Sequence, residues 1–168
     1  MYENGTYPFI QTGEVSRAKG GKIEYSQTLN EEGLKVSRLF KPNTVLMTIA
    51  ANIGNTAILD FEACFPDSVV SIRPKEDLDI YFLDYYLRGQ KEYLNAIAPQ
   101  SAQKNINVQI LSTLKIPVPP VSEQRRIVSE IQAFQTKIET LKAAQSGQLS
   151  ALEGLFGGVL EQAFRGEW

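Results

Sequence analysis

The feature that most constrains the fold is a proline-rich stretch, residues 115–121, followed by a long segment with helical periodicity. Its three prolines exclude a regular helix and a central strand, because proline lacks a backbone N–H and has a fixed φ. The stretch therefore divides the chain into two parts. We predict a stiff junction at 115–121 between a globule, residues 1–114, and a helical region, residues 122–168.

From Ile127 onward, apolar residues recur at alternating spacings of four and three, which is the heptad repeat of a coiled coil. The repeat predicts one helix from an N-cap at Ser122 to about Phe164, roughly 60 Å long. One globule cannot cover a stripe of that length, so we expect the helix to project from the globule and to pair with a second helix. The predicted interface consists of Ile127, Ile131, Phe134, Ile138, Leu141, Gln145, Gln148, Leu152, Leu155 and Val159.

The middle of this stripe leaves two arrangements open. Gln145 and Gln148 are polar at interface positions, and each glycine in the segment weakens a helix by about 1 kcal/mol relative to alanine. The segment could therefore break near Ser146 and Gly147 into a helical hairpin. If the helix continues instead, the two glutamines are expected to pair and to fix the register of a coiled coil.

The first part of the chain alternates short apolar runs with turn residues, which indicates a mixed α/β globule. The predicted elements are strands at 8–11, 44–50, 55–61 and 68–74, a tight turn at 51–54, and a helix at 79–97 that is capped by Asp77 or Asp79 and ended by Pro99. The predicted fold class is therefore α+β, a mixed α/β globule followed by a long C-terminal coiled-coil helix.

Several classes of function lack the residues that they require. The chain has no histidine and one cysteine, Cys64, which lies in an apolar run typical of a buried thiol. No P-loop, methylase motif or nuclease motif is present. We therefore expect no catalytic residue, no metal site and no cofactor. The chain also lacks a membrane-spanning run and a signal peptide, which favours a cytoplasmic protein with no membrane partner.

The net charge of −2 does not by itself indicate a protein that binds nucleic acid, because such proteins are usually basic. Its distribution is uneven, however. Residues 14–41 carry six basic and four acidic side chains, and residues 87–115 carry four basic and one acidic. Residues 42–86 carry two basic and seven acidic side chains. The two segments with excess positive charge are candidates for contact with an anionic partner.

Seven motifs follow one another along almost the whole chain. They are PFIQTGEV (8–15), VLMTIAANIGNTAIL (45–59), CFPDSVVSIRP (64–74), FLDYYL (82–87), SAQKNIN (101–107), LKIPVPPVSEQRRIV (114–128) and LEQAFRGEW (160–168). In sequence and in order they resemble the motifs of specificity subunits of type I restriction-modification systems. The pair SAQKNIN and IPVPPVSEQRRIV is the most specific part of the resemblance.

The resemblance implies a function that the composition does not. Specificity subunits have two target recognition domains, each for one half of a split DNA site, and two long helices. The helices pair antiparallel, set the spacer length and dock methylase subunits, which hold S-adenosylmethionine. By this resemblance the chain is a non-catalytic DNA-recognition subunit, and its partners are double-stranded DNA, methylase subunits and, through them, the restriction motor subunit.

The chain departs from the family pattern in two respects. It has one recognition domain and one helix, as in half a subunit, and only seven residues precede PFIQTGEV, so the domain is expected to lack an N-terminal portion. Half a subunit has no second helix, which predicts a homodimer through the long helix. A second hypothesis is a coiled-coil scaffold whose globule has lost autonomous DNA binding.

Seven polar or basic residues are candidates for DNA contact, because lysine and arginine suit phosphate and amides suit adenine edges. Each has a structural alternative: the SAQKNIN amides could cap a helix starting near Asn107, the basic loop around Gly20 and Gly21 could be solvated, and the asparagine could form a turn. The candidates are Arg17, Lys19, Lys22, Asn52, Gln103, Lys104 and Asn105.

Overall fold

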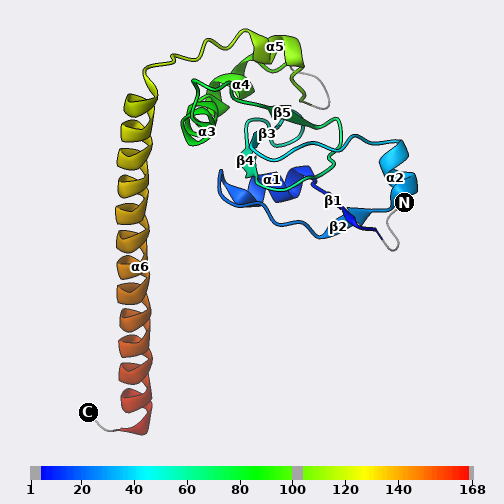
Figure 1. Ribbon diagram of the computed structural model, residues 1–168. Helices are drawn as coiled ribbons and strands as arrows, with labels where there is room; N and C mark the ends of the chain where they lie inside the picture. Colours follow the sequence, from blue (N-terminus) through cyan, green and yellow to red (C-terminus); the bar gives the residue numbers. More distant parts are fainter. Residues whose placement is uncertain (1–4, 100–103, 167–168) are drawn as a thin grey trace. The chain divides into compact units, whose positions relative to one another are not determined.

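The computed structural model describes residues 5–99 and 104–166 (Figure 1). The chain divides into two compact units, residues 1–126 and 127–168. The elements are β1 (Tyr7–Phe9), α1 (Thr12–Ala18), β2 (Gln27–Leu29), α2 (Glu31–Lys35), β3 (Thr44–Thr48), β4 (Thr56–Leu59), β5 (Val69–Ile72), α3 (Ile80–Gly89), α4 (Lys91–Ile97), α5 (Val108–Ser112) and α6 (Val121–Arg165).

A three-stranded antiparallel sheet in the order β4-β3-β5 lies at the centre of the first unit. Every residue of β3 is buried, since this strand is covered on both faces. Leu46 packs with Val15 of α1 on one face, whereas Val45 and Met47 pack with Leu83 of α3 on the other. Figure 1 accordingly shows α1 on one side of the sheet and α3 with α4 on the opposite side. The mixed α/β globule predicted from the sequence is confirmed.

A second, two-stranded sheet joins β1 and β2 in antiparallel register. It is fastened to the rest of the unit beside Cys64, whose N–H donates to the Pro8 carbonyl at 2.8 Å. Cys64 is fully buried, and this burial raises the pKa of its thiol, as expected for a structural cysteine. The predicted strands 44–50, 55–61 and 68–74 are present but shorter, and the connection between β3 and β4 is a loop of residues 49–55 rather than the tight turn predicted at 51–54.

The helix expected at 79–97 is interrupted. It forms α3 and α4, which meet at Gln90 directly after Gly89. The side chain of Asp79 caps α3 by accepting from the N–H groups of Tyr81 and Phe82, which confirms Asp79 rather than Asp77 as the cap. The predicted helix near Asn107 also forms, and the Asn107 side chain accepts from the Ile110 N–H at 2.9 Å.

The first turn of α6 is built into the first unit through one buried side chain. Gln124 is completely buried, and its Oε1 accepts from the Asp79 N–H at 2.8 Å. Its Nε2 donates to the carbonyls of Asp77, at 2.8 Å, and Pro119, at 2.7 Å. The helix begins at Val121, so Ser122 lies inside the first turn and is not the N-cap that the sequence suggested. Instead, the Pro120 carbonyl accepts the first helical hydrogen bonds, from Glu123 and Gln124.

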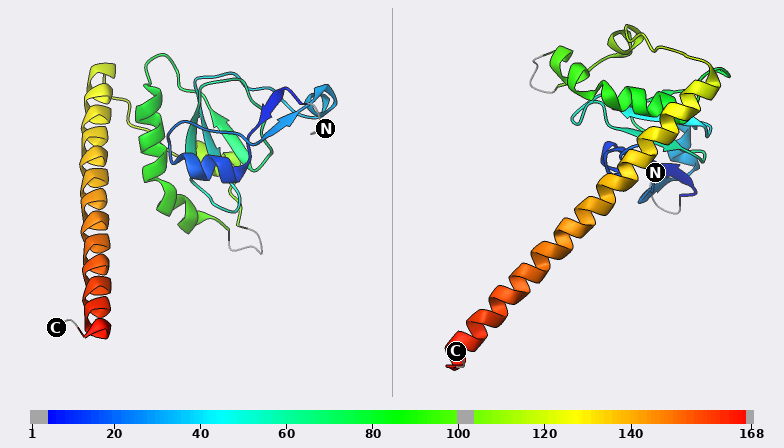
Figure 2. Two further views of the ribbon diagram at one scale, coloured as in Figure 1. Left: turned by 90° about the horizontal axis from the view of Figure 1, so that it is seen from below. Right: turned by 90° about the vertical axis from the view of Figure 1, so that its left-hand side faces the viewer.

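From that turn α6 runs without interruption for 45 residues to Arg165 (Figure 2). The helical hairpin with a break near Ser146 and Gly147 is therefore wrong, because both residues lie within regular helix. No helix among the described residues is long and apolar enough to cross a membrane. Three roles stay predictions: residues 1–114 as the recognition domain, residues 115–121 as a stiff junction, and residues 122–168 as the helical region that pairs with a second helix.

Candidate nucleic-acid interface

The basic residues predicted near the N-terminus lie together at the end of α1. Arg17 is in the last turn of α1 with 71% of its side chain exposed, and Lys19 forms the left-handed C-cap at φ 48°. Lys22 is exposed and pairs with Ile58 of β4 through a parallel β-bridge. We call residues 17–22 the basic turn. All three cations are accessible to a partner.

Gly20 has a fixed conformation that is held by its neighbours in β4 and α3. Its φ is +81°, and its N–H donates to the Thr56 carbonyl at 2.8 Å. A Cβ at this position would lie 2.5 Å from Oδ2 of Asp84 and 2.7 Å from the guanidinium carbon of Arg88. Glycine is therefore required because the backbone has a left-handed conformation and approaches α3 closely. The backbone of the basic turn is fastened to β4 and α3.

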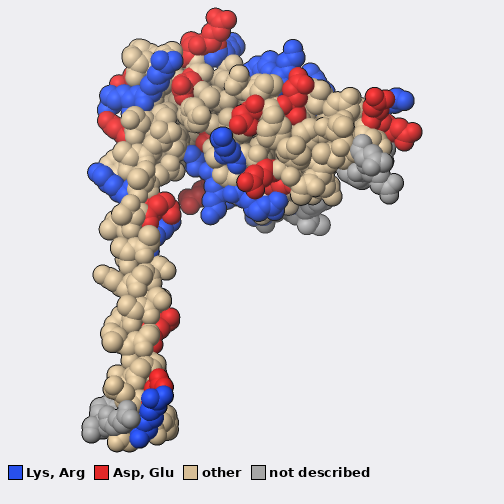
Figure 3. All heavy atoms as spheres, turned by 60° about the horizontal axis from the view of Figure 1, so that its bottom comes forward, with Lys and Arg blue, Asp and Glu red and all other residues tan. Residues whose placement is uncertain are grey.

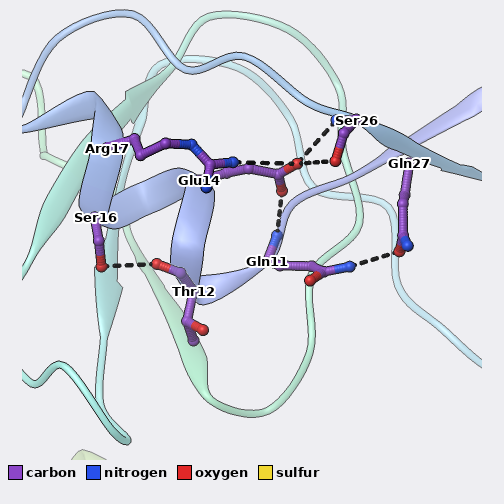
Figure 4. A network of polar contacts seen from close by, with 7 residues as sticks. All are labelled: Gln11, Thr12, Glu14, Ser16, Arg17, Ser26 and Gln27. Atoms are coloured by element: carbon purple, nitrogen blue, oxygen red, sulfur yellow. Dashed lines mark hydrogen bonds and ion pairs between the residues drawn. The ribbon is translucent and has the colours of Figure 1, made fainter.

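The other end of α1 is held by a buried carboxylate, shown in Figure 4. Glu14 is 4% exposed and accepts from the Gln11 N–H at 2.7 Å, and from both the N–H and the hydroxyl of Ser26 at 2.8 Å. Burial by itself would raise the pKa of Glu14. The hydrogen bonds from Gln11 and Ser26 and the Arg17 guanidinium 4.0 Å away outweigh burial and lower this pKa. The ionised Glu14 thus joins α1 to the segment that leads into β2.

This network leads to a prediction about pH. Replacing Glu14 by Gln should lower the free energy of unfolding at about pH 7 by roughly 2 kcal/mol, because two N–H groups and a hydroxyl lose a charged acceptor. A lowered pKa means that the ionised group stabilises the fold above the ordinary glutamate pKa. This stabilisation disappears as the pH falls through the lowered value.

Urea unfolding of both proteins between about pH 7 and pH 3 measures the difference. The two curves should converge on acidification. A difference that stays constant down to the lowest pH would show that the ionised form of Glu14 is not what stabilises this region.

Two of the predicted amide candidates, Asn52 and Asn105, lie around the loop between β3 and β4. Ala50 and Asn105 form an antiparallel β-bridge, and the Ile106 N–H donates to the Ile49 carbonyl at 2.9 Å. Exposed Lys104 and Asn105 are thereby brought next to the loop that contains exposed Asn52. The loop itself is closed by Thr48, whose hydroxyl donates to the Asn52 carbonyl. Gln103 lies outside the described residues.

Asn55 connects this loop to the basic turn, which the sequence did not predict. Its Nδ2 donates to the Ser16 hydroxyl of α1 at 2.8 Å, and its Oδ1 accepts from Nζ of Lys91 at 2.6 Å. Lys91 starts α4, so three elements meet at one amide. The excess positive charge of residues 87–115 drew attention to the segment that contains Lys91. Its partner Asn55 is 36 positions away in the sequence, however, and no local pattern indicates their contact.

The two predicted groups therefore belong to one region of the first unit. The basic turn and the β3–β4 loop are joined through Ser16 and Asn55, and residues 104–106 flank the same loop. Figure 3 shows basic side chains in several separate groups over the visible surface of this unit, with acidic side chains among them. Arg17 and Lys22 also line a shallow hollow of about 270 Å³ together with Glu14 and Glu24. The face offers separated cations rather than one continuous positive surface, and cations of this kind suit individual phosphates.

The second unit contributes the apolar stripe of α6. Ile127 and Ile131 are partly buried, and the remaining predicted interface residues are exposed. Exposure is 64% for Phe134 and 63% for Leu152, values far above those of core residues. Further exposed apolar residues widen the stripe toward the C-terminus: Leu149, Phe156 and Leu160.

At 3.6 residues per turn, the apolar positions between Leu149 and Leu160 span about 140° of the helix surface. A two-stranded coiled coil needs a narrower stripe. This half of α6 therefore offers more apolar surface than one partner helix covers.

No group of three or more His, Cys, Asp or Glu side chains in the described part of the chain is arranged to hold a metal ion. The polar clusters of the first unit consist of hydroxyl, amide, carboxylate and cationic groups whose mutual contacts fix loops and helix ends. Such an arrangement is suited to holding exposed cations and amides in place for binding.

The comparisons with known proteins all point to one family. Residues 1–150 match the family model of the type I restriction modification DNA specificity domain. The putative type I restriction enzyme MjaX specificity subunit of Methanocaldococcus jannaschii is 28% identical over 133 residues, which cover 79% of this chain and 30% of the relative. The EcoBI specificity subunit of Escherichia coli is 26% identical over 163 residues, covering 94% of this chain and 34% of the relative.

A solved structure from work on complex assembly and conformational transition of the type I R-M system matches with a TM-score of 0.79 and 26% identity. The match covers all of this chain and 40% of the solved chain. The present chain thus spans about a third of the length of the curated relatives that it matches.

Proposed function

The chain belongs to the type I restriction-modification DNA specificity family, and from this premise we propose that it is a sequence-specific DNA-recognition module of such a system. The observation that carries the proposal is the fastened basic turn. Lys19 and Lys22 are exposed on a backbone that is hydrogen-bonded to β4 and α3, near a loop that presents exposed Asn52 and is flanked by exposed Asn105. Cations held in this way suit phosphates, and the adjacent amides suit base edges.

In this proposal the chain has no catalytic residue and binds no cofactor. It directs methylase subunits, and through them the restriction motor subunit, to double-stranded DNA in the cytoplasm. Arg125 and Arg126 in the first turns of α6, and the wide apolar surface around Phe156, are the regions proposed to meet the methylase subunit. The scaffold alternative, in which the globule no longer binds DNA, is less favoured because it gives no role to the exposed basic turn.

We further propose that α6 pairs with the α6 of a second copy in antiparallel orientation. The support is an apolar stripe that remains exposed from Phe134 to Val159, together with the antiparallel pairing of two long helices that the resemblance to specificity subunits implies. A two-fold axis near Gln145 and Gln148 would let each amide meet a symmetry-related amide. Because each globule precedes its helix in the chain, this pairing would present two identical recognition domains to a palindromic split site.

Charge reversal at the candidate residues tests the DNA proposal. Lys104→Glu, or Arg17→Glu together with Lys19→Glu, should weaken DNA binding by the chain assembled with the methylase subunit. Each lost phosphate contact should also lower the slope of log K against log salt by about one. Filter binding or fluorescence anisotropy at several salt concentrations measures both quantities.

The matched control is Lys75→Glu, alone or with Arg73→Glu, because both side chains are exposed in the acidic segment 42–86. These variants change the net charge equally and should leave the salt slope unchanged. Equal slopes for every variant would exclude this face as the DNA-binding surface. A wild-type assembly without salt-dependent DNA binding would favour the scaffold alternative instead.

A further inference from the structure

A buried ion pair on α3 lies directly beneath the basic turn. Asp84 is 1% exposed, and its Oδ1 accepts from the Thr56 hydroxyl at 2.6 Å. Nε of Arg88, one helical turn later, lies 3.0 Å from Oδ2, in a geometry that makes the contact ionic rather than a well-aligned hydrogen bond. Burial raises the pKa of Asp84, and the contacts of Thr56 and Arg88 oppose that increase. The pair is thus fixed to β4 through Thr56.

Arg88 extends from this pair to the backbone of the basic turn. Its Nη1 donates to the Lys19 carbonyl at 2.8 Å, and its guanidinium carbon lies 4.4 Å from the centre of the Tyr85 ring. Gly20, the next residue, is in contact with the same carboxylate and guanidinium, and its N–H is bonded to Thr56. The peptide group between Lys19 and Gly20 is therefore held on both sides, at its carbonyl by α3 and at its N–H by β4.

Resting on the proposed function, we infer that the Asp84–Arg88 pair is a positioning element for DNA binding. Arg88 holds Lys19 and Gly20 in the left-handed conformation that presents the side chains of Lys19 and Lys22 to phosphates. Lys19 at φ 48° is in a region that costs a non-glycine residue free energy, so an external contact is needed to keep it populated. The turn is therefore already ordered before DNA binds, and binding does not have to supply the free energy of ordering it.

The same geometry argues against Arg88 as a direct DNA contact. Only 25% of its side chain is exposed, and its charge is balanced by buried Asp84 at 3.0 Å. Its Nη1 is used by Lys19 and its flat face by Tyr85. By contrast, Arg17 in the same region is 71% exposed. Arg88 therefore acts through the residues that it holds.

The test uses Arg88→Lys, which keeps the positive charge but cannot bridge Asp84 and the Lys19 carbonyl in the same fork geometry. We expect the full chain assembled with the methylase subunit to bind DNA about tenfold more weakly. The amide hydrogen of Gly20 should exchange at least about tenfold faster in the free protein, because its bond to Thr56 opens more often. Arg73→Lys is the matched control, since Arg73 also donates to a carbonyl, that of Pro42, but lies outside the basic turn.

A double-mutant cycle separates positioning from a general effect on folding. In the background Lys19→Gln with Lys22→Gln, Arg88→Lys should change DNA affinity by less than about twofold, because the cations that it positions are gone. An equal loss in both backgrounds would overturn the inference and make Arg88 an independent contact or a purely structural residue. Unchanged exchange at Gly20 would overturn it as well.

Failure of the proposed function has a different signature. If the unmodified assembly shows no salt-dependent DNA binding, both proposals are wrong: DNA recognition by the chain and positioning by the Asp84–Arg88 pair. If the unmodified assembly binds DNA but Lys19→Gln with Lys22→Gln binds equally well, recognition stands and the positioning inference is wrong.

Discussion

Three aspartates introduced into the α6 stripe are expected to convert the proposed dimer into monomers of low solubility. In Ile131→Asp, Ile138→Asp, Leu152→Asp, each substitution removes an apolar contact worth roughly 1.5–3 kcal/mol and adds a charge that would be buried on association. Six such changes per dimer should raise the dissociation constant by at least about a thousandfold. Sedimentation velocity at micromolar concentration should show one species near the monomer mass.

The control for this variant places the same three charges on the opposite face of the helix, in Thr136→Asp, Ala143→Asp, Ser150→Asp. These positions are exposed and lie away from the apolar stripe, so the dimer should persist. A well-behaved monomer of the unmodified chain at micromolar concentration would contradict self-pairing. The stripe of the continuous helix would then belong to a partner of another sequence.

Replacing Gln124 by Met is expected to lower the free energy of unfolding of the first unit by about 3 kcal/mol. Methionine has a similar shape but leaves the Asp79 N–H and the carbonyls of Asp77 and Pro119 without their buried partner. The same change should loosen the N-terminus of α3, since Asp79 is also its cap. Thermal unfolding followed by near-ultraviolet circular dichroism should show a midpoint about 10 °C lower.

Gln132→Met makes the same exchange at an exposed position on α6, and should leave the midpoint within about 1 °C. If both variants melt at the temperature of the unmodified protein, the amide of Gln124 does not stabilise the unit. Greater protease sensitivity near Pro119 only in the Gln124 variant would further localise the loss to the start of α6.

Long, strongly patterned elements were predictable from the sequence. The strand at Thr44–Thr48 is an apolar run because both of its faces are covered, and α6 has a heptad repeat over most of its length. The continuity of α6 through Gly147 was left open, since glycine weakens a helix without necessarily breaking it.

Short helices could not be predicted in the same way. The seven residues of α1 include few core residues, and two turns are too few for a hydrophobic period to be recognised. This helix depends on tertiary contacts, among them those of Glu14 with Ser26 and of Val15 with the core. The break between α3 and α4 at Gln90 was missed for a related reason, because the apolar spacing continues across it.

Within the candidate interface, the sequence indicated the exposed cations but not what holds them. Arg17, Lys19 and Lys22 stood out as basic residues around two glycines, whereas Arg88 contacts the turn from 69 positions away. Gly20 illustrates the difference, because the sequence does not show whether a glycine is required for close packing or for flexibility. Only the tertiary structure distinguishes them.

The contacts of Gln124 have a consequence for how sequences of this kind can diverge. Its three partners are an N–H and two carbonyls of the main chain, and every residue but proline offers both groups. Substitutions at positions 77 and 119 that preserve the backbone path therefore leave this attachment intact. Because the attachment uses main-chain atoms, it constrains the path of the backbone at these positions and not the identity of the side chains there.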